Sequence, residues 1–173
     1  QKVMIDSHQH FWDLKRGDYH WLTEDLVDLY QDFLPVDLMP LLENAGVSKT
    51  VLVQAAATVL ETEFLLDLAN RHDFIAGVVG WVDLELGEKA INNLSVLAKN
   101  PKLRGVRPMI HEIADPEWML RDDLELAINA IPDLNLCFDA LVRPEHLEYL
   151  LAFIRKYPSL DVVIDHGAKP DIV

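Results

Sequence analysis

The chain has 173 residues, half of them hydrophobic, and its 15 basic and 29 acidic residues give a formal net charge of −14. This hydrophobic content argues against intrinsic disorder, and the length suffices for one buried core. The negative charge argues against nucleic acid or an anionic membrane as a general partner. We therefore expect a single domain over residues 1–173 that binds neither nucleic acid nor membrane.

The sequence shows neither a targeting segment nor a disulfide framework. No apolar stretch reaches the length of a membrane span, and the N-terminus lacks the pattern of a signal peptide, which predicts a soluble cytoplasmic protein. The single cysteine, Cys137, lies within the apolar segment 134–138, so no internal disulfide can form. We expect Cys137 to pack in the core.

Apolar runs and turn signals predict strands that alternate with helices. A long loop with an irregular or helical stretch, over residues 12–33, follows the first strand. The predicted strands cover about residues 3–7, 51–54, 75–82, 103–107, 134–138 and 161–164. The predicted helices run from residue 35 to a stop at Gly46, and over about 60–72, 87–99, 117–130 and 144–156.

This order is typical of parallel βα units, which build either a doubly wound open sheet or an eight-stranded barrel. A dinucleotide-binding sheet usually has a glycine-rich turn after its first strand. Here that turn is Ser7-His8-Gln9-His10. The sequence therefore favours the barrel, in which active sites lie at the C-terminal ends of the strands.

His8 and His10 are the first candidate site residues. Side chains alternate faces along a strand, so two imidazoles at positions i and i+2 point the same way and can meet one cation or one substrate oxygen. Histidine pairs also occur at strand ends where they satisfy only local hydrogen bonds. A second pair, Asp165-His166, ends a later predicted strand in the same manner and supports the functional interpretation.

Polar side chains follow every predicted strand, and in a barrel these ends converge. Arg104 and Arg107 flank Gly105, and a guanidinium binds carboxylates and polarised oxygens at two points. We expect Arg107 to contact substrate, whereas Arg104 fits an ion pair equally well. The strand-end residues are His8, His10, Gln54, Trp81, Asp83, Arg104, Arg107, Asp139, Arg143, Asp165, His166 and Lys169.

Aromatic and further histidine residues leave alternatives open. Trp12 and Trp81 fit the apolar wall of a sugar pocket and fit ordinary core equally well. His111 lies in a loop that could reach the site. Three other histidines are expected at the surface, and the acidic residues between Glu24 and Asp37 are expected to form a solvated face rather than a cation site. These three histidines are His20, His72 and His146.

Several segments of the chain, taken in order, resemble the sequences of the amidohydrolase-related lactonases, the group that contains L-fuconolactonase and L-rhamnonolactonase. The opening Ile5-Asp6-Ser7-His8-Gln9-His10-Phe11-Trp12 and the later Tyr19-His20-Trp21-Leu22 carry this resemblance. Further matching segments are residues 51–55, 80–84, 103–107 and 163–170. The resemblance therefore runs along the whole chain and is more specific than the histidine pair alone.

The resemblance implies a (β/α)₈ barrel that hydrolyses sugar-derived lactones, with His8, His10 and His166 around a divalent metal or the reacting carbonyl. Zinc is the first candidate, although several lactonases of this group work without metal. It also implies a general-base aspartate after the eighth strand, which has no counterpart here because only about six βα units are present. We thus expect the N-terminal part of a truncated barrel.

In this interpretation His166 and Arg107 are catalytic, and water attacks a polarised lactone carbonyl. The partner is a small lactone or sugar acid, and identical chains could associate. Alternatives are a metal-dependent decarboxylase on the same barrel, and a noncatalytic fragment or interaction protein. The predicted substrate-binding residues are Trp12, Gln54, Trp81, Arg104, Arg107, Asp139 and Lys169.

Overall fold

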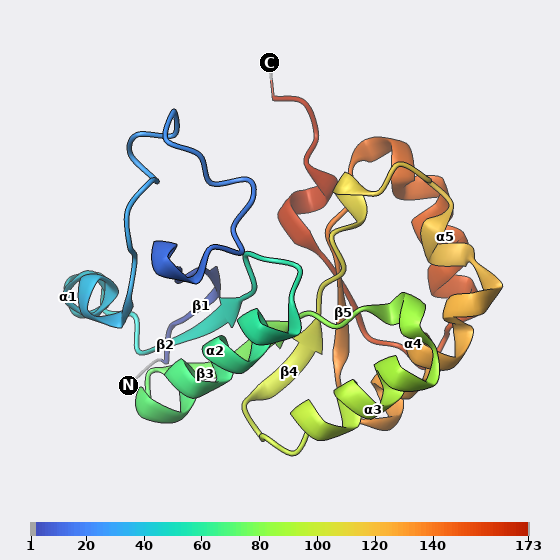
Figure 1. Ribbon diagram of the computed structural model, residues 1–173, viewed down its shortest axis with the longest axis horizontal. Helices are drawn as coiled ribbons and strands as arrows, with labels where there is room; N and C mark the ends of the chain where they lie inside the picture. The colour runs from blue at the N-terminus through green and yellow to red at the C-terminus, as the bar shows by residue number, and fades with distance from the viewer. Residues whose placement is uncertain (1–2, 173) are drawn as a thin grey trace. The chain divides into compact units, whose positions relative to one another are not determined.

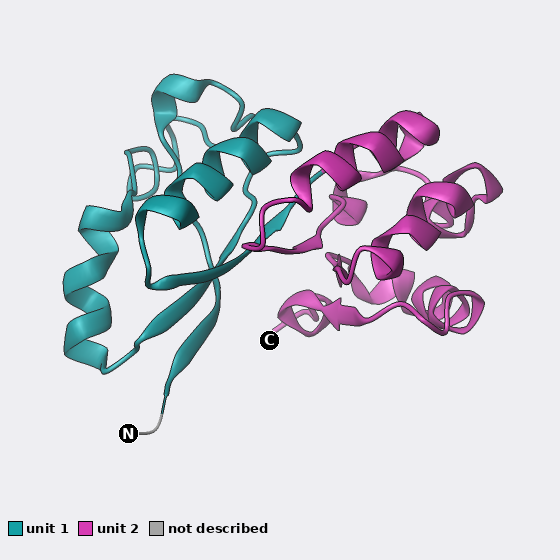
Figure 2. Ribbon diagram, turned by 90° about the horizontal axis from the view of Figure 1, so that it is seen from below, with its two compact units in different colours: residues 1–81 teal, residues 82–173 magenta. Residues whose placement is uncertain are grey.

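The structure is a computed structural model that describes residues 3–172. The chain divides into two compact units, residues 1–81 and residues 82–173, which Figure 2 colours separately. Each unit contains three parallel strands and the helices that connect them. The prediction of one domain over residues 1–173 stays a prediction.

Unit 1 has its three strands side by side in chain order, with the second in the middle (Figure 1). Its strands are β1 (Ile5–Gln9), β2 (Lys49–Val53) and β3 (Ile75–Gly80). Its helices are the short η1 (Leu14–Arg16), then α1 (Pro35–Ala45) and α2 (Val59–Arg71). Residues between η1 and α1 form a long loop, as the sequence predicted.

Helix α2 shows how sequence fixes the packing of unit 1. Thr58 is its N-cap and accepts a hydrogen bond from the backbone N–H of Glu61, a pattern that favours a helix start. The helix packs against β3. Gly80 ends that strand where a Cβ atom would clash with the side chain of Thr62. The glycine therefore allows the close approach of α2 and β3.

Unit 2 repeats the arrangement, with β5 between its two neighbours. Its strands are β4 (Leu103–Val106), β5 (Cys137–Ala140) and β6 (Val162–Ile164). Its α-helices are α3 (Glu88–Leu97), α4 (Glu125–Asp133) and α5 (Leu147–Lys156). Its short 3₁₀ turns are η2 (Leu84–Leu86), η3 (Ile110–Glu112), η4 (Trp118–Leu120), η5 (Asp122–Leu124), η6 (Pro144–His146) and η7 (Asp165–Ala168).

The predicted alternation of strand and helix is confirmed, and three elements are corrected. The helix expected over 117–130 is instead two 3₁₀ turns followed by α4, which continues to Asp133. The strand expected over 134–138 begins at Cys137, because Asn135 adopts a left-handed conformation with φ of 56° after the helix end. β1 also lies later than expected and includes His8.

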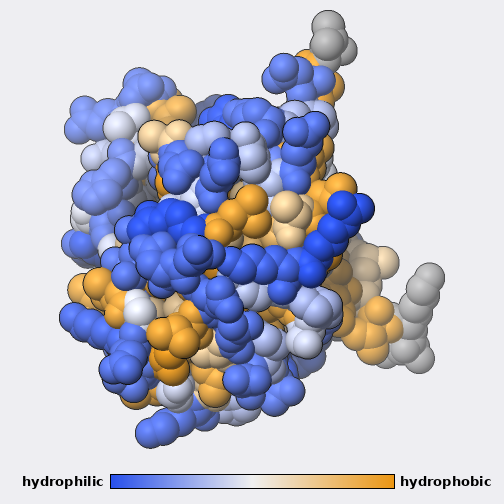
Figure 3. Space-filling view, turned by 90° about the vertical axis from the view of Figure 1, so that its right-hand side faces the viewer, coloured by the Kyte–Doolittle hydropathy of each residue, from blue (hydrophilic) through white to orange (hydrophobic). Residues whose placement is uncertain are grey.

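The surface of unit 2 mixes polar and apolar side chains. In Figure 3 apolar areas are separated by hydrophilic ones on the face shown. On α5, Leu147, Leu151 and Ile154 are exposed, whereas Leu150 and Phe153 are buried. No helix within residues 3–172 combines the length and apolar character needed to cross a membrane.

Candidate functional site

The histidine pair lies at the C-terminal end of β1. His8 is in the strand, and His10 follows its last residue. The two Nε2 atoms are 3.2 Å apart, and the rings meet edge to face with centroids separated by 4.9 Å. The prediction that both imidazoles point the same way is therefore confirmed.

A backbone carbonyl orients His10. Its Nδ1 lies 2.8 Å from the carbonyl oxygen of Val53, the last residue of β2. A carbonyl only accepts hydrogen bonds, so neutral His10 has its proton on Nδ1 and a lone pair on Nε2. Histidines that bind metals commonly donate their other ring N–H in this way. The backbone of β2 thus sets the tautomer of a residue that follows β1.

The spacing of the two nitrogens fits a metal ion. Two nitrogen ligands at 2.0–2.1 Å from a tetrahedral zinc ion are about 3.3 Å apart. The observed 3.2 Å between the Nε2 atoms of His8 and His10 matches this separation. The pair can therefore supply two ligands to one divalent cation.

The other predicted residues of unit 1 differ in their surroundings. Gln54 is fully buried directly after β2. Trp12 is buried, donates from Nε1 to the carbonyl of Gln31, and meets the ring of Trp21 edge to face. Trp81 is half-buried after β3. His10 and Trp12 also line a mainly apolar cavity of about 300 Å³ beside α1.

Unit 2 presents a buried ion pair after its strands. Arg107, which follows β4 and is 3% exposed, donates from Nη1 to Asp165 Oδ2 at 3.1 Å. Asp165, also buried, follows β6. Two buried charges of opposite sign hold each other in a fixed geometry at the cost of desolvation. Their arrangement keeps a guanidinium at the end of β4.

Strand register explains how this charge cluster forms. Gly105 pairs with Cys137, and a Cβ atom at Gly105 would lie 2.5 Å from the Cys137 sulfur. Two residues further along each strand, on the same faces, are Arg107 and Asp139. The absence of a side chain at Gly105 therefore makes room for the Cys137 sulfur. Arg107 and Asp139 come next on the same faces of their strands.

Burial dominates the electrostatics of Asp139, which is 5% exposed. Burial, and next the charge of Asp165, raise its pKa to about 6, against the opposing effects of a hydrogen bond from Cys137 and the charge of Arg107. The Cys137 thiol donates to Asp139 Oδ1 at 3.4 Å. Burial, followed by the charge of Asp139, raises the pKa of Cys137 to about 12, so it remains a thiol.

His111, in η3 after β4, has a cationic environment. Burial, and then the charges of Lys169, Arg143 and Arg107, lower its pKa to about 4, so the imidazole is neutral at pH 7. The electrostatic influence of Lys169 and Arg107 places His111 near the strand-end residues of unit 2, as the sequence suggested. Such a group of positive charges suits an anionic or strongly polarised oxygen.

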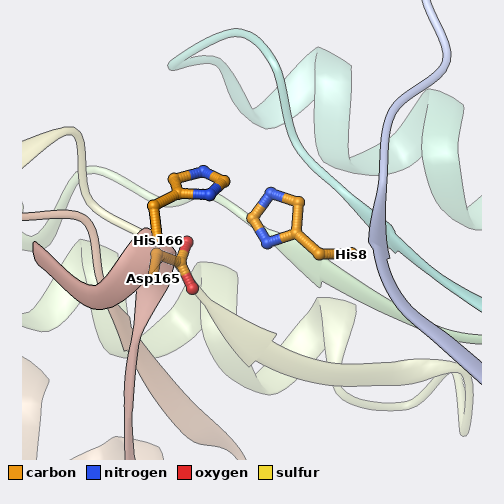
Figure 4. Close-up of side chains that lie close together, drawn as sticks. All are labelled: His8, Asp165 and His166. Atoms are coloured by element: carbon orange, nitrogen blue, oxygen red, sulfur yellow. The ribbon is translucent and has the colours of Figure 1, made fainter. Parts of the chain in front are cut away.

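The turn after β6 carries the Asp165-His166 pair. Figure 4 shows these two side chains adjacent on the turn η7, and the ring of His8 on β1. His166 is exposed and has a φ of 52°, and Ala168 and Lys169 also have positive φ. Clustered left-handed residues other than glycine are costly and concentrate at functional sites.

A family model described as amidohydrolase matches residues 5–173. The chain belongs to this amidohydrolase family. It is 50% identical over 168 residues to an L-fucono-1,5-lactonase of Burkholderia ambifaria, covering 97% of this chain and 58% of the relative. It is 35% identical over 172 residues to an L-fucono-1,5-lactonase of Burkholderia multivorans, covering 97% of this chain and 56% of the relative.

Solved structures of amidohydrolases have the same fold as this chain. Two crystal structures of an amidohydrolase from Burkholderia multivorans, one with bound HEPES and one with bound zinc, superpose with TM-scores of 0.89 and 0.87 at 33% identity. They cover 97% of this chain, which spans 58% and 59% of those chains. The expected fold class, a (β/α)₈ barrel of the amidohydrolase type with six βα units present, is confirmed. The chain spans less than two thirds of the length of these relatives.

Three features of this amidohydrolase chain differ from the sequence interpretation or exceed it. The sequence placed Asp165 after a strand but assigned it no role. Its ion pair with Arg107 becomes visible only when the register of the strands is known. His146 was expected at the surface but is buried, and its Nδ1 accepts a hydrogen bond from the backbone N–H of Arg143. Arg104 is exposed within β4, on the opposite face from Gly105.

Proposed function

We propose that the chain forms part of a lactonase that hydrolyses sugar-derived lactones, with L-fucono-1,5-lactone as the first substrate to test. The observation that carries this proposal is the 50% identity to the Burkholderia ambifaria L-fucono-1,5-lactonase over 97% of the chain. Carbohydrate metabolism in the cytoplasm is the setting that this activity fits.

His8 and His10 are proposed as metal ligands, because their Nε2 atoms have the spacing of two zinc ligands and His10 has the matching tautomer. We extend the ligand role to His166 on the basis of the sequence resemblance. A bound divalent metal would polarise the lactone carbonyl or lower the pKa of water. The zinc bound in the Burkholderia multivorans amidohydrolase makes zinc the first ion to test.

Arg107 is proposed to donate hydrogen bonds to the lactone carbonyl oxygen and to stabilise the oxyanion as water attacks. Its ion pair with Asp165 fixes one guanidinium nitrogen before substrate arrives, and preorganised donors of this kind lower the barrier of acyl transfer. His166 is proposed either to transfer a proton during the reaction or to bind the metal. The remaining proposed substrate contacts are Trp12, Gln54, Trp81, Asp139 and Lys169. Arg104 was also predicted as a contact, but its exposure on the opposite face of β4 from Gly105 argues against that role.

The test is a panel of aldonolactones added to the longest form of the protein that its gene encodes, with proton release followed by a pH indicator. The proposal predicts hydrolysis of L-fucono-1,5-lactone or a close stereoisomer, and loss of activity with a metal chelator if the metal is required. Carbon dioxide release from aromatic acids, without lactone hydrolysis, would favour the decarboxylase. Inactivity in both assays would favour the noncatalytic alternative.

A further inference from the structure

A second cluster of charged side chains lies in unit 1 and belongs to none of the predicted site residues. At its centre is Glu61, in the first turn of α2, which is 0% exposed. The Tyr19 hydroxyl donates to Glu61 Oε1 at 3.1 Å and accepts from Arg16 Nε at 3.3 Å. A carboxylate is rarely buried so completely without a reason specific to its position.

Asp18 provides a second connection between the long loop and α2. Asp18 Oδ2 accepts from Arg16 Nη2 at 2.7 Å and from the Thr58 hydroxyl at 2.8 Å. The Thr58 hydroxyl in turn accepts from the backbone N–H of Glu61 at 3.0 Å. Three residues of the loop region are thus joined to the N-cap and third residue of α2. The Thr-x-x-Glu spacing is that of a capping box, but here the glutamate bonds the loop.

The segment fastened in this way covers the end of β2. Trp21 donates from Nε1 to the carbonyl of Ala55 at 2.7 Å, immediately after Gln54. Trp12, Tyr19 and Leu22 pack with Ala55 and Ala56 in one buried cluster. Apart from η1, residues 12–33 contain no regular helix or longer strand. These side-chain bonds hold the loop together with backbone hydrogen bonds within it, among them the antiparallel bridge between Trp12 and Phe33.

The charge of Glu61 changes near neutral pH. Burial raises its pKa to about 7, Asp18 acts in the same direction, and Arg16, the Tyr19 hydroxyl and the Ala55 backbone N–H oppose the rise. Arg16, Asp18 and Tyr19 are the charged and titratable groups that face it. Its Oε2 is buried and has no hydrogen-bond partner within residues 3–172. The ionised form is therefore poorly compensated.

We propose that Glu61 is the positioning residue of the 12–33 loop, and that its protonated form fastens the loop to the first turn of α2. The fastened loop binds this proton more tightly than an open loop, in which Glu61 is hydrated. Rising pH therefore favours opening. The proposal goes beyond lactone hydrolysis and does not need it, although the loop carries Trp12, one of the proposed substrate contacts.

Hydrogen exchange of the 173-residue chain tests this directly, with rates corrected for intrinsic exchange. If the open loop has the ordinary pKa of 4.5 and the closed loop a pKa of about 7, the opening constant rises about 30-fold from pH 5.5 to pH 8.5. We expect this rise in peptides from residues 13–33 and not in those from β3 of the same unit. A loop without the rise, or an equal rise in β3, would overturn the proposal.

The variant Glu61→Gln keeps the size of the side chain and cannot ionise. Its loop should show the same opening constant at both pH values, while the matched control Glu63→Gln, exposed on the same helix, should behave as wild type. A pH-dependent rise that persists in Glu61→Gln would contradict the assignment. If this variant does not fold, Tyr19→Phe serves instead: losing the hydroxyl should extend the rise to higher pH, and an unchanged profile would overturn the proposal.

Discussion

The two units share an alternation of strands and helices but hold their strand-end side chains differently. In unit 1, a backbone carbonyl of β2 orients His10. In unit 2, Arg107 and Asp165 hold each other, with Asp139 contributing to the field around them. A carbonyl neither titrates nor disappears on substitution of its side chain. We therefore expect the Nδ1 hydrogen bond of His10 to survive substitution of the Val53 side chain, whereas the cluster of unit 2 depends on the side chains of Arg107 and Asp165 themselves.

Breaking the ion pair should have the largest effect on stability. Arg107→Met leaves the buried Asp165 without its cation, which costs about 3–5 kcal/mol in other buried pairs. Urea unfolding measures the loss. Arg155→Met, which removes an exposed arginine of α5, should change the free energy of unfolding by less than about 0.5 kcal/mol. A loss below about 1 kcal/mol for Arg107→Met would show that the pair is not structurally required.

Asp139→Asn should change how stability depends on pH. Because the folded-state pKa of Asp139 is raised from 3.8 to about 6, the folded protein binds this proton more tightly than the unfolded chain. The favourable contribution is complete below about pH 4 and is lost as pH rises to about 6. Relative to wild type, the variant should gain about 3 kcal/mol between pH 3.5 and pH 7.5.

Chemical denaturation at several pH values provides the comparison for Asp139. Asp133→Asn, at the exposed end of α4, is the control and should follow the wild-type curve. If the difference between wild type and Asp139→Asn is the same at every pH, burial does not raise the pKa of this carboxyl.

The histidine pair should be needed for zinc affinity. We expect His8→Asn and His10→Asn each to weaken zinc binding by roughly 100-fold or more, since loss of a ligand should cost at least as much as loss of its supporting hydrogen bond. Competition with a fluorescent chelator measures the affinity. His20→Asn, an exposed histidine of the loop, should bind as wild type does. Equal affinity in all four proteins would place the ion elsewhere.

Cys137 reports on the cluster of unit 2 without any substitution. With a pKa of about 12 its thiolate is scarce, and labelling by a disulfide reagent at pH 8 should be roughly a thousandfold slower than in unfolded protein. Comparison of labelling rates in buffer and in urea tests this. Equal rates would mean that the hydrogen bond to Asp139 and the burial of the thiol are not maintained.

Local signals in the sequence predicted much of the fold and the common direction of the His8 and His10 side chains. Periodicity and turn residues located the strands, and the spacing of His8 and His10 placed them on one face. The start of β5 was missed because Asn135 takes a left-handed conformation that asparagine tolerates but does not require. The Arg107–Asp165 pair depends on register between strands far apart in the sequence, which no local pattern specifies.

The most direct test of the central claim is kcat/KM for L-fucono-1,5-lactone in the longest form of the protein, compared with His10→Asn and Arg107→Lys. Loss of a metal ligand or of an oxyanion donor should lower kcat/KM by about 100-fold or more. Arg155→Lys should retain the wild-type value. Wild-type activity in both His10→Asn and Arg107→Lys would contradict the account, because neither the histidine pair nor the buried guanidinium would then serve the reaction.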